Sequence, residues 1–80
     1  MNAQEMFEKL GYVKNESFIP DILYEKVKKK SRHTIVFSPK LRKYQCYLHI
    51  NGVAHVGRSE EISVRLHQAI TQQMKELKWL

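Results

Sequence analysis

Hydrophobic positions recur at helical spacing near the start of the chain and at strand spacing in its middle. Three apolar side chains lie on one side of a first helix: Met6, Phe7 and Leu10. Asn2 can cap this helix, because Glu5 stands three residues later, as in a capping box. Gly11 is placed to end the helix in a left-handed conformation. A short N-terminal helix is therefore predicted.

Two segments after a loop containing Pro20 favour strands. Residues 22–27 (ILYEKV) and 33–37 (HTIVF) are rich in β-branched and aromatic residues. The polar residues 28–32 between them suit a hairpin loop. Ser38 followed by Pro39 ends the second strand, because proline cannot donate to a sheet.

The clearest alternation covers residues 44–50. Four side chains face one way (Tyr44, Cys46, Leu48 and Ile50), and Gln45, Tyr47 and His49 face the other. This pattern is typical of a half-buried strand. Asn51-Gly52 follows and is a strong hairpin signal, since both turn positions need a positive φ. Residues 53–56 are then expected to return as a further strand.

A helix from Arg65 to about Lys78 is predicted by apolar residues at helical spacing: Ile62, Leu66, Ile70, Met74 and Leu77. Its start has two interpretations. Ser59 followed by two glutamates can begin the helix, whereas the alternation through residues 62–64 fits a short strand that leads into it. Periodicity alone does not decide between them.

The order of these elements predicts a single α+β domain over residues 1–80. An antiparallel meander of three to four strands has its apolar face covered by the C-terminal helix, with the short N-terminal helix beside it. The lone Cys46 allows no internal disulfide and indicates a reducing compartment. The opening residues are unlike a signal peptide, and no stretch approaches the ~20 apolar residues that span a bilayer. We therefore expect a cytoplasmic protein without a membrane segment.

The net charge of +6 is unevenly distributed. Residues 26–43 carry +8 with no acidic residue, and the remainder of the chain carries −2. On the predicted fold this charge lies mainly in two loops, residues 28–32 and 40–43, at opposite ends of one strand. Their separation is on the order of 15–20 Å for five or six strand residues. A basic strip is therefore predicted in preference to one basic pocket.

The candidate polyanion-binding residues combine the two loops with the polar face of the strand at 44–50. They are Lys28, Lys29, Lys30, Arg32, Lys40, Arg42, Lys43, Tyr47 and His49. Lysine and arginine neutralise phosphates and release counterions, and aromatic rings stack on bases. The simpler interpretation is a solvated basic surface, because no glycine-rich phosphate loop or known nucleic-acid motif accompanies these residues.

No metal site, cofactor or catalytic group is predicted. Cys46 and His49 are three residues apart, but they point to opposite faces of a strand and cannot share one ion. Cys46 is better explained as a small core residue. His55 and the Glu60-Glu61 pair lack a converging nucleophile or oxyanion hole. We therefore expect a protein that is not an enzyme.

The end of the C-terminal helix offers a second candidate surface. The main interpretation of its apolar stripe is a core contact with the sheet. The alternative is that Met74, Trp79 and Leu80 extend past the sheet and contact a partner, since exposed aromatic residues mark interfaces.

Both ends of the chain carry a recognisable pattern. Residues 5–12 read EMFEKLGY and residues 69–80 read AITQQMKELKWL, with Ile22, Tyr24 and Lys26 between them. This resembles a family of small phage and prophage proteins of Gram-positive bacteria, with an E-MFE-LGY start, an I-Y-K strand and an AI--Q--ELGWL end. The resemblance favours a strand at 62–64 and implies a phage or prophage origin, but no chemistry.

Two departures from that pattern affect the C-terminal helix. Lys78 stands where the family has glycine, which puts a glycine-terminated helix end in doubt. Residues 65–67 stand where the pattern favours acidic residues followed by leucine, which leaves the helix start open.

Two functions are expected from these observations. The first is a phage-type accessory protein that acts by binding another, unidentified protein. The second is a nucleic-acid-binding module that uses the basic residues 26–43. The sequence does not determine the partner or the oligomeric state.

Overall fold

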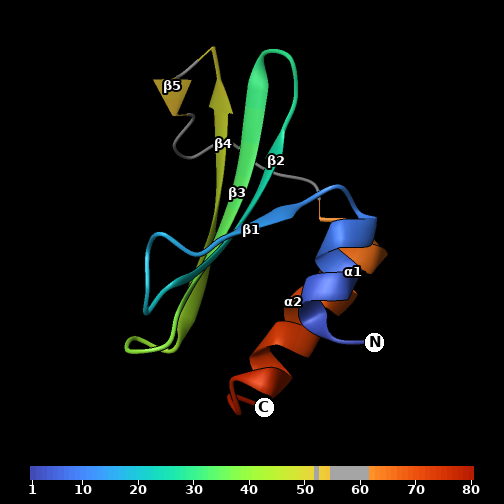
Figure 1. The fold of residues 1–80 in the computed structure, drawn as a ribbon, viewed down its shortest axis with the longest axis vertical. Coiled ribbons are helices and arrows are strands. Elements are labelled where there is room, and N and C mark those ends of the chain that lie inside the picture. The colour runs from blue at the N-terminus through green and yellow to red at the C-terminus, as the bar shows by residue number, and fades with distance from the viewer. Residues whose placement is uncertain (52, 55–61) are drawn as a thin grey trace.

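The computed structural model describes residues 1–51, 53–54 and 62–80. Its elements are α1 (Ala3–Lys9), β1 (Val13–Asn15), β2 (Ile22–Val27), β3 (Ser31–Ser38), β4 (Lys43–Ile50), β5 (Val53–Ala54) and α2 (Val64–Glu76). In the described residues the strands form one antiparallel sheet in chain order, from β1 to β5. The predicted α+β class, with a meander and two terminal helices, is confirmed (Figure 1).

The two helices pack against one face of the sheet, where cross-strand partners form apolar rows. Tyr24, Ile35 and Cys46 make one row across β2, β3 and β4, and Ile22, Phe37 and Tyr44 make the next. The buried cluster combines these rows with helix residues: Ala3, Phe7, Tyr12, Tyr24, Ile35, Phe37, Leu66, Ala69 and Ile70. Cys46 is half-buried and packs against this cluster, so its predicted role as a core residue is confirmed.

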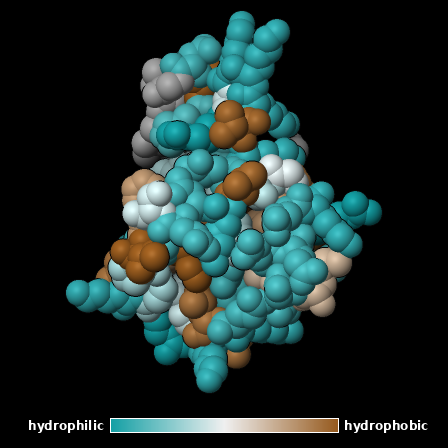
Figure 2. Space-filling model, in the orientation of Figure 1, coloured by the Kyte–Doolittle hydropathy of each residue, from teal (hydrophilic) through white to brown (hydrophobic). Residues whose placement is uncertain are grey.

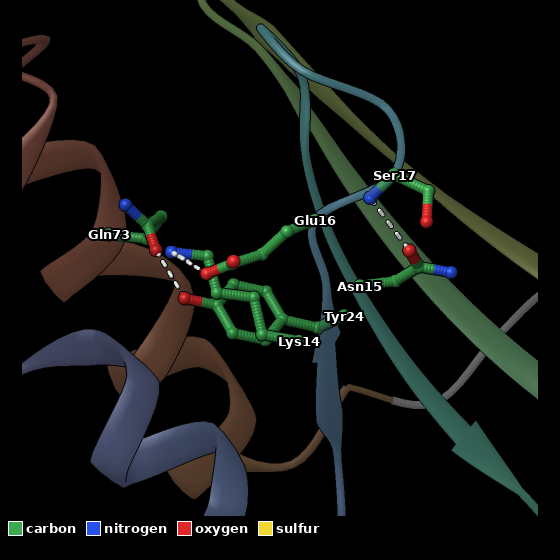
Figure 3. A network of polar contacts seen from close by, with 6 residues as sticks. All are labelled: Lys14, Asn15, Glu16, Ser17, Tyr24 and Gln73. Atoms are coloured by element: carbon green, nitrogen blue, oxygen red, sulfur yellow. Dashed lines mark hydrogen bonds and ion pairs between the residues drawn. The ribbon is translucent and has the colours of Figure 1, made fainter.

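Tyr24 links the sheet to both helices. Its ring stacks on Phe7 of α1, with centroids 4.0 Å apart and planes 15° from parallel. Its hydroxyl donates to Oε1 of Gln73 on α2 at 2.7 Å, and both side chains are buried (Figure 3). Burial, followed by the carboxylates of Glu76 and Glu8, raises the pKa of Tyr24 to about 12. The hydroxyl therefore remains a protonated donor at neutral pH.

A second polar contact joins the helices to each other. Oε2 of Glu76, in the last turn of α2, accepts a hydrogen bond of 2.7 Å from the backbone N–H of Ala3. That N–H has no partner within α1, because the first N–H groups of a helix are always left over. Glu76 also accepts from Nε2 of Gln72 at 3.0 Å. The start of α1 is therefore held against the end of α2, and the two helices lie antiparallel (Figure 1).

Both helices end in the same left-handed motif. Gly11 follows α1 with φ +92°, and Lys78 follows α2 with φ +61°. In each case the next residue closes the motif through its backbone N–H, Tyr12 to Phe7 O at 3.0 Å and Trp79 to Met74 O at 2.9 Å. The aromatic side chains of Tyr12 and Trp79 thereby turn back onto the core. The end of α2 is thus left-handed at Lys78, although this residue is not glycine.

The start of α2 differs from what the sequence predicted. A strand at residues 62–64 is wrong, because Val64 is already the first helical residue. Oγ of Ser63 caps the helix by accepting from the N–H of Leu66 at 3.1 Å. The alternative start at Ser59 lies outside the described residues. Ser63, three positions before Leu66, can cap a helix, and this signal competes with the strand-like alternation of Ile62 and Val64; the helix cap forms.

The sheet also differs at its turns and at one edge. An unpredicted edge strand, β1, pairs with β2, from Val13 opposite Glu25 to Asn15 opposite Leu23. The predicted loop at residues 28–32 is shorter, because Ser31 and Arg32 belong to β3. Of the returning strand predicted at 53–56, Val53–Ala54 is confirmed as β5, and residues 55–56 lie outside the described part. No helix among the described residues is long and apolar enough to cross a membrane.

We predict that Lys78→Gly stabilises the protein. A left-handed conformation disfavours a residue with a Cβ, so glycine at this position should raise the free energy of unfolding by about 1 kcal/mol. Chemical denaturation measures the change. The matched control is Lys75→Gly, which places glycine inside the last turn of α2 and should lower the free energy by a similar amount. A loss of stability in Lys78→Gly would contradict the left-handed helix end.

Candidate polyanion-binding surface

The face of the sheet opposite the helices carries a polar strip along β4. Successive residues of a strand point to opposite faces, so Lys43, Gln45, Tyr47 and His49 lie on the side away from Cys46 and the core. Arg32 of β3 pairs directly with His49 and lies on the same face. These five residues are called the β4 strip, and they extend over about 20 Å of strand.

Basic turns continue the β4 strip at both ends. The β2–β3 turn contains Lys28, Lys29 and Lys30, and the β3–β4 turn contains Lys40 and Arg42. Figure 1 shows these turns at opposite ends of the sheet, as the register of β3 requires. The two basic turns are therefore separated along β3, as expected for a strip along one edge or face of the sheet. Their separation is longer than predicted, on the order of 25 Å for the eight residues of β3.

One end of the strip is hollowed. An open pocket of about 380 Å³ lies between the β2–β3 turn and the end of β4, lined by Val27, Lys29, Lys30, Ser31, Arg32, His49 and Asn51. The backbone N–H of Asn51 donates to the carbonyl of Lys30 at 2.8 Å, which holds the two walls together. Asn51 has φ +53°, the left-handed conformation that the sequence predicted for this turn.

His49 contributes an unusual polar atom to the same end. Its Nδ1 is shielded from solvent and has no hydrogen-bond partner among the described residues. An unsatisfied buried polar atom destabilises a fold by about 1–3 kcal/mol. Among the described residues, His49 is therefore a position whose polar ring the packing of the sheet does not explain.

The middle of the strip is polar and aromatic. Tyr47 is 39% exposed, and its hydroxyl donates to Oε1 of Gln45 at 2.5 Å. Thr34, opposite Tyr47 on β3, is buried, and Glu25 follows in the same row on β2. Glu25 is the acidic side chain of β2 that shares this face. The tyrosine thus presents a partly exposed ring between the two cationic ends.

The cationic groups of this surface have no acidic partner among the described residues. The ion pair found among the described residues lies outside this surface. It joins Nζ of Lys14 on β1 to Oε1 of Glu16, in the loop after β1, at 3.9 Å (Figure 3). Figure 2 shows hydrophilic side chains projecting from the end of the molecule where the β2–β3 turn lies. Within the described part of the chain, no ion pair involves the cations of the strip and its turns.

The remaining candidate residues lie on the core side or near the C-terminus. Met74 and Trp79 pack against the core, with the Trp79 ring 6.3 Å from Phe37, whereas Leu80 is 69% exposed. Nη2 of Arg42 donates to the backbone carbonyl of Trp79 at 3.4 Å, which ties the β3–β4 turn to the chain end. Most of the predicted partner surface is thus occupied by intramolecular contacts.

The structure adds three residues to the site that sequence reasoning did not name as candidates: Val27, Ser31 and Asn51. Asn51 lines the pocket, and its pairing with Lys30 joins two turns that are distant in sequence. Cys46 and His49 lie on opposite faces as predicted. Within the described residues no group of three or more histidine, cysteine, aspartate or glutamate side chains is placed to hold a metal.

Comparisons with family models, curated proteins and solved structures find no match for this chain. The interpretation of the surface therefore rests on its own geometry and charge.

We predict that His49→Phe stabilises the protein. Phenylalanine keeps a ring but removes the unsatisfied Nδ1, so the free energy of unfolding should rise by about 1 kcal/mol. Tyr47→Phe is the control, because it removes an exposed hydroxyl from the same strand and should change stability by less than about 0.5 kcal/mol. Chemical denaturation of both variants measures this. A loss of about 1 kcal/mol or more in His49→Phe would contradict the absence of a partner for Nδ1.

Proposed function

We propose that the protein is a non-enzymatic binding protein whose ligand is single-stranded nucleic acid, held along the β4 strip. The observation that supports this proposal most is the presence of cations, without an ion-pair partner among the described residues, at both ends of a strip with a partly exposed tyrosine in the middle. Such a combination of basic groove and aromatic platform binds single strands without base-specific hydrogen bonds.

The charge distribution supports the same ligand class. Residues 26–43 carry +8 while the remainder of the chain carries −2, so an approaching polyanion is attracted to one part of the molecule. A single strand fits better than a duplex, because only unstacked bases can contact a tyrosine ring on a sheet face. Glu25 lies on β2 in the same row as Tyr47, and its negative charge should keep a phosphate chain away from that side of the strip.

We expect the protein to bind oligothymidylate at low salt, with an affinity that falls steeply as salt rises. Lys43→Gln removes one cation from the strip and should lower the slope of log K against log salt by about 0.7. Tyr47→Ala should weaken binding about tenfold through loss of stacking. Fluorescence anisotropy of a labelled oligonucleotide measures both effects. Lys75→Gln is the control, because Lys75 is exposed on α2 and away from the strip.

Two results would contradict this proposal. Absence of binding at low salt would exclude nucleic acid as the ligand. Binding that Lys43→Gln and Lys75→Gln weaken equally would show a general charge effect and no role for the β4 strip.

A second candidate function, binding of another protein, is favoured by exposed apolar residues at the opposite end of the sheet from the pocket. Ile19 and Phe18, in the β1–β2 loop, are 81% and 55% exposed, and Leu41 in the β3–β4 turn is 63% exposed. Both segments lie at the same end, because Ile22 pairs with Phe37. The resemblance to phage and prophage proteins would place such a partner in the cytosol of a bacterial host.

We expect a tagged copy in such a host to recover one stoichiometric protein if this second function operates. The double substitution Phe18→Ser and Ile19→Ser should abolish recovery by removing the apolar contact. Val27→Ser is the control, since Val27 is 71% exposed but lies at the pocket end. Recovery of no protein, or equal recovery by the double variant, would count against this function.

A further inference from the structure

We infer that the pocket at the end of the β4 strip binds the terminal phosphate monoester of a nucleic-acid strand, an inference that rests on the proposed function. The pocket is lined by three cationic side chains, Lys29, Lys30 and Arg32, together with His49 and Asn51, and its described lining contains no acidic residue. Its position at one end of the strip makes it suited to a chain end.

The charge of the lining favours a monoester over an internal phosphate. A terminal phosphate carries between one and two negative charges at neutral pH, whereas a diester within the chain carries one. Each additional charge strengthens the hydrogen bonds that lysine and arginine donate, since bonds to ionised acceptors are stronger than neutral ones. Three cations around one cavity therefore match a dianion better than a single phosphodiester.

The walls of the pocket are built before any ligand arrives. The hydrogen bond from Asn51 to Lys30 holds the β2–β3 turn against the end of β4. Two further backbone bonds close the turn itself, from Lys28 N–H to Ser31 O at 2.7 Å and from Ser31 N–H to Lys28 O at 3.3 Å. A turn fixed in this way loses little further freedom when a phosphate binds, which favours affinity.

The same geometry gives the path of the bound strand. The pocket and the β4 strip share Arg32 and His49, so a phosphate seated in the pocket lies at the start of the strip. The nucleotides that follow can then continue past Tyr47 toward Lys43. His49 also lines the pocket at this junction, paired with Arg32 across the two strands.

The test compares three oligothymidylates of equal length: one with a 5′-phosphate, one with a 3′-phosphate and one with hydroxyls at both ends. We expect one phosphorylated form to bind about tenfold more tightly than the unphosphorylated one, the difference that an added charged hydrogen bond provides. Arg32→Gln should abolish this preference. Lys43→Gln, at the other end of the strip, should lower the affinity for all three oligonucleotides by the same factor. The preference for the phosphorylated form should remain. Which phosphorylated form is favoured gives the direction of the strand.

Each contrary result has a separate meaning. Equal affinity for all three oligonucleotides would overturn the terminal-phosphate site while leaving single-strand binding in place. A preference that persists in Arg32→Gln would also overturn the site, because the phosphate would then be bound elsewhere. No binding of any oligonucleotide would overturn both this inference and the proposed function.

In the wild-type protein, inorganic phosphate should shift the NMR signals of His49 and Asn51, and unchanged signals at saturating phosphate would count against the pocket.

Discussion

The contacts of Tyr24 determine which face of the sheet belongs to the core. The ring of this one residue stacks on α1 through Phe7, and its hydroxyl binds α2 through Gln73. Because a strand alternates its side chains, burying Tyr24 commits the paired residues Ile35 and Cys46 to the helix side. The alternate residues of each strand must then face outward, among them the apolar pair Leu23 and Val36 and the polar residues Gln45, Tyr47 and His49 of β4. The β4 strip is therefore a consequence of how the core is closed.

This division explains how so small a domain combines a stable interior with a free basic surface. The helices use one side of the sheet, and their ends are fixed by Glu76 at Ala3 and by the left-handed residues Gly11 and Lys78. The other side combines the buried Leu23 and Thr34 with basic residues that lack acidic partners among the described residues. Its basic residues lie outside the buried cluster that joins the sheet to the helices. On this surface, Nδ1 of His49 is buried without a hydrogen-bond partner among the described residues, which is unfavourable for folding.

Much of this arrangement follows from local sequence signals, but the joining of its parts does not. The capping box at Asn2, the alternation over residues 44–50 and the stripe from Leu66 onward each predict their element, because each depends on neighbouring residues alone. β1 was missed because three residues at an edge carry too short a pattern to recognise. The pocket was missed for a different reason. It depends on the bond between Lys30 and Asn51, which are distant in sequence and meet only through strand register.

The central claim is that the outward face of β4 receives the ligand, and alternate side chains along this strand test it most directly. In an NMR titration with oligothymidylate, the side-chain signals of Gln45, Tyr47 and His49 should shift progressively. The signals of Cys46 and Leu48, which point to the helices, should remain in place apart from small indirect effects. Shifts of equal size on both sets, or shifts confined to Cys46 and Leu48, would contradict the claim.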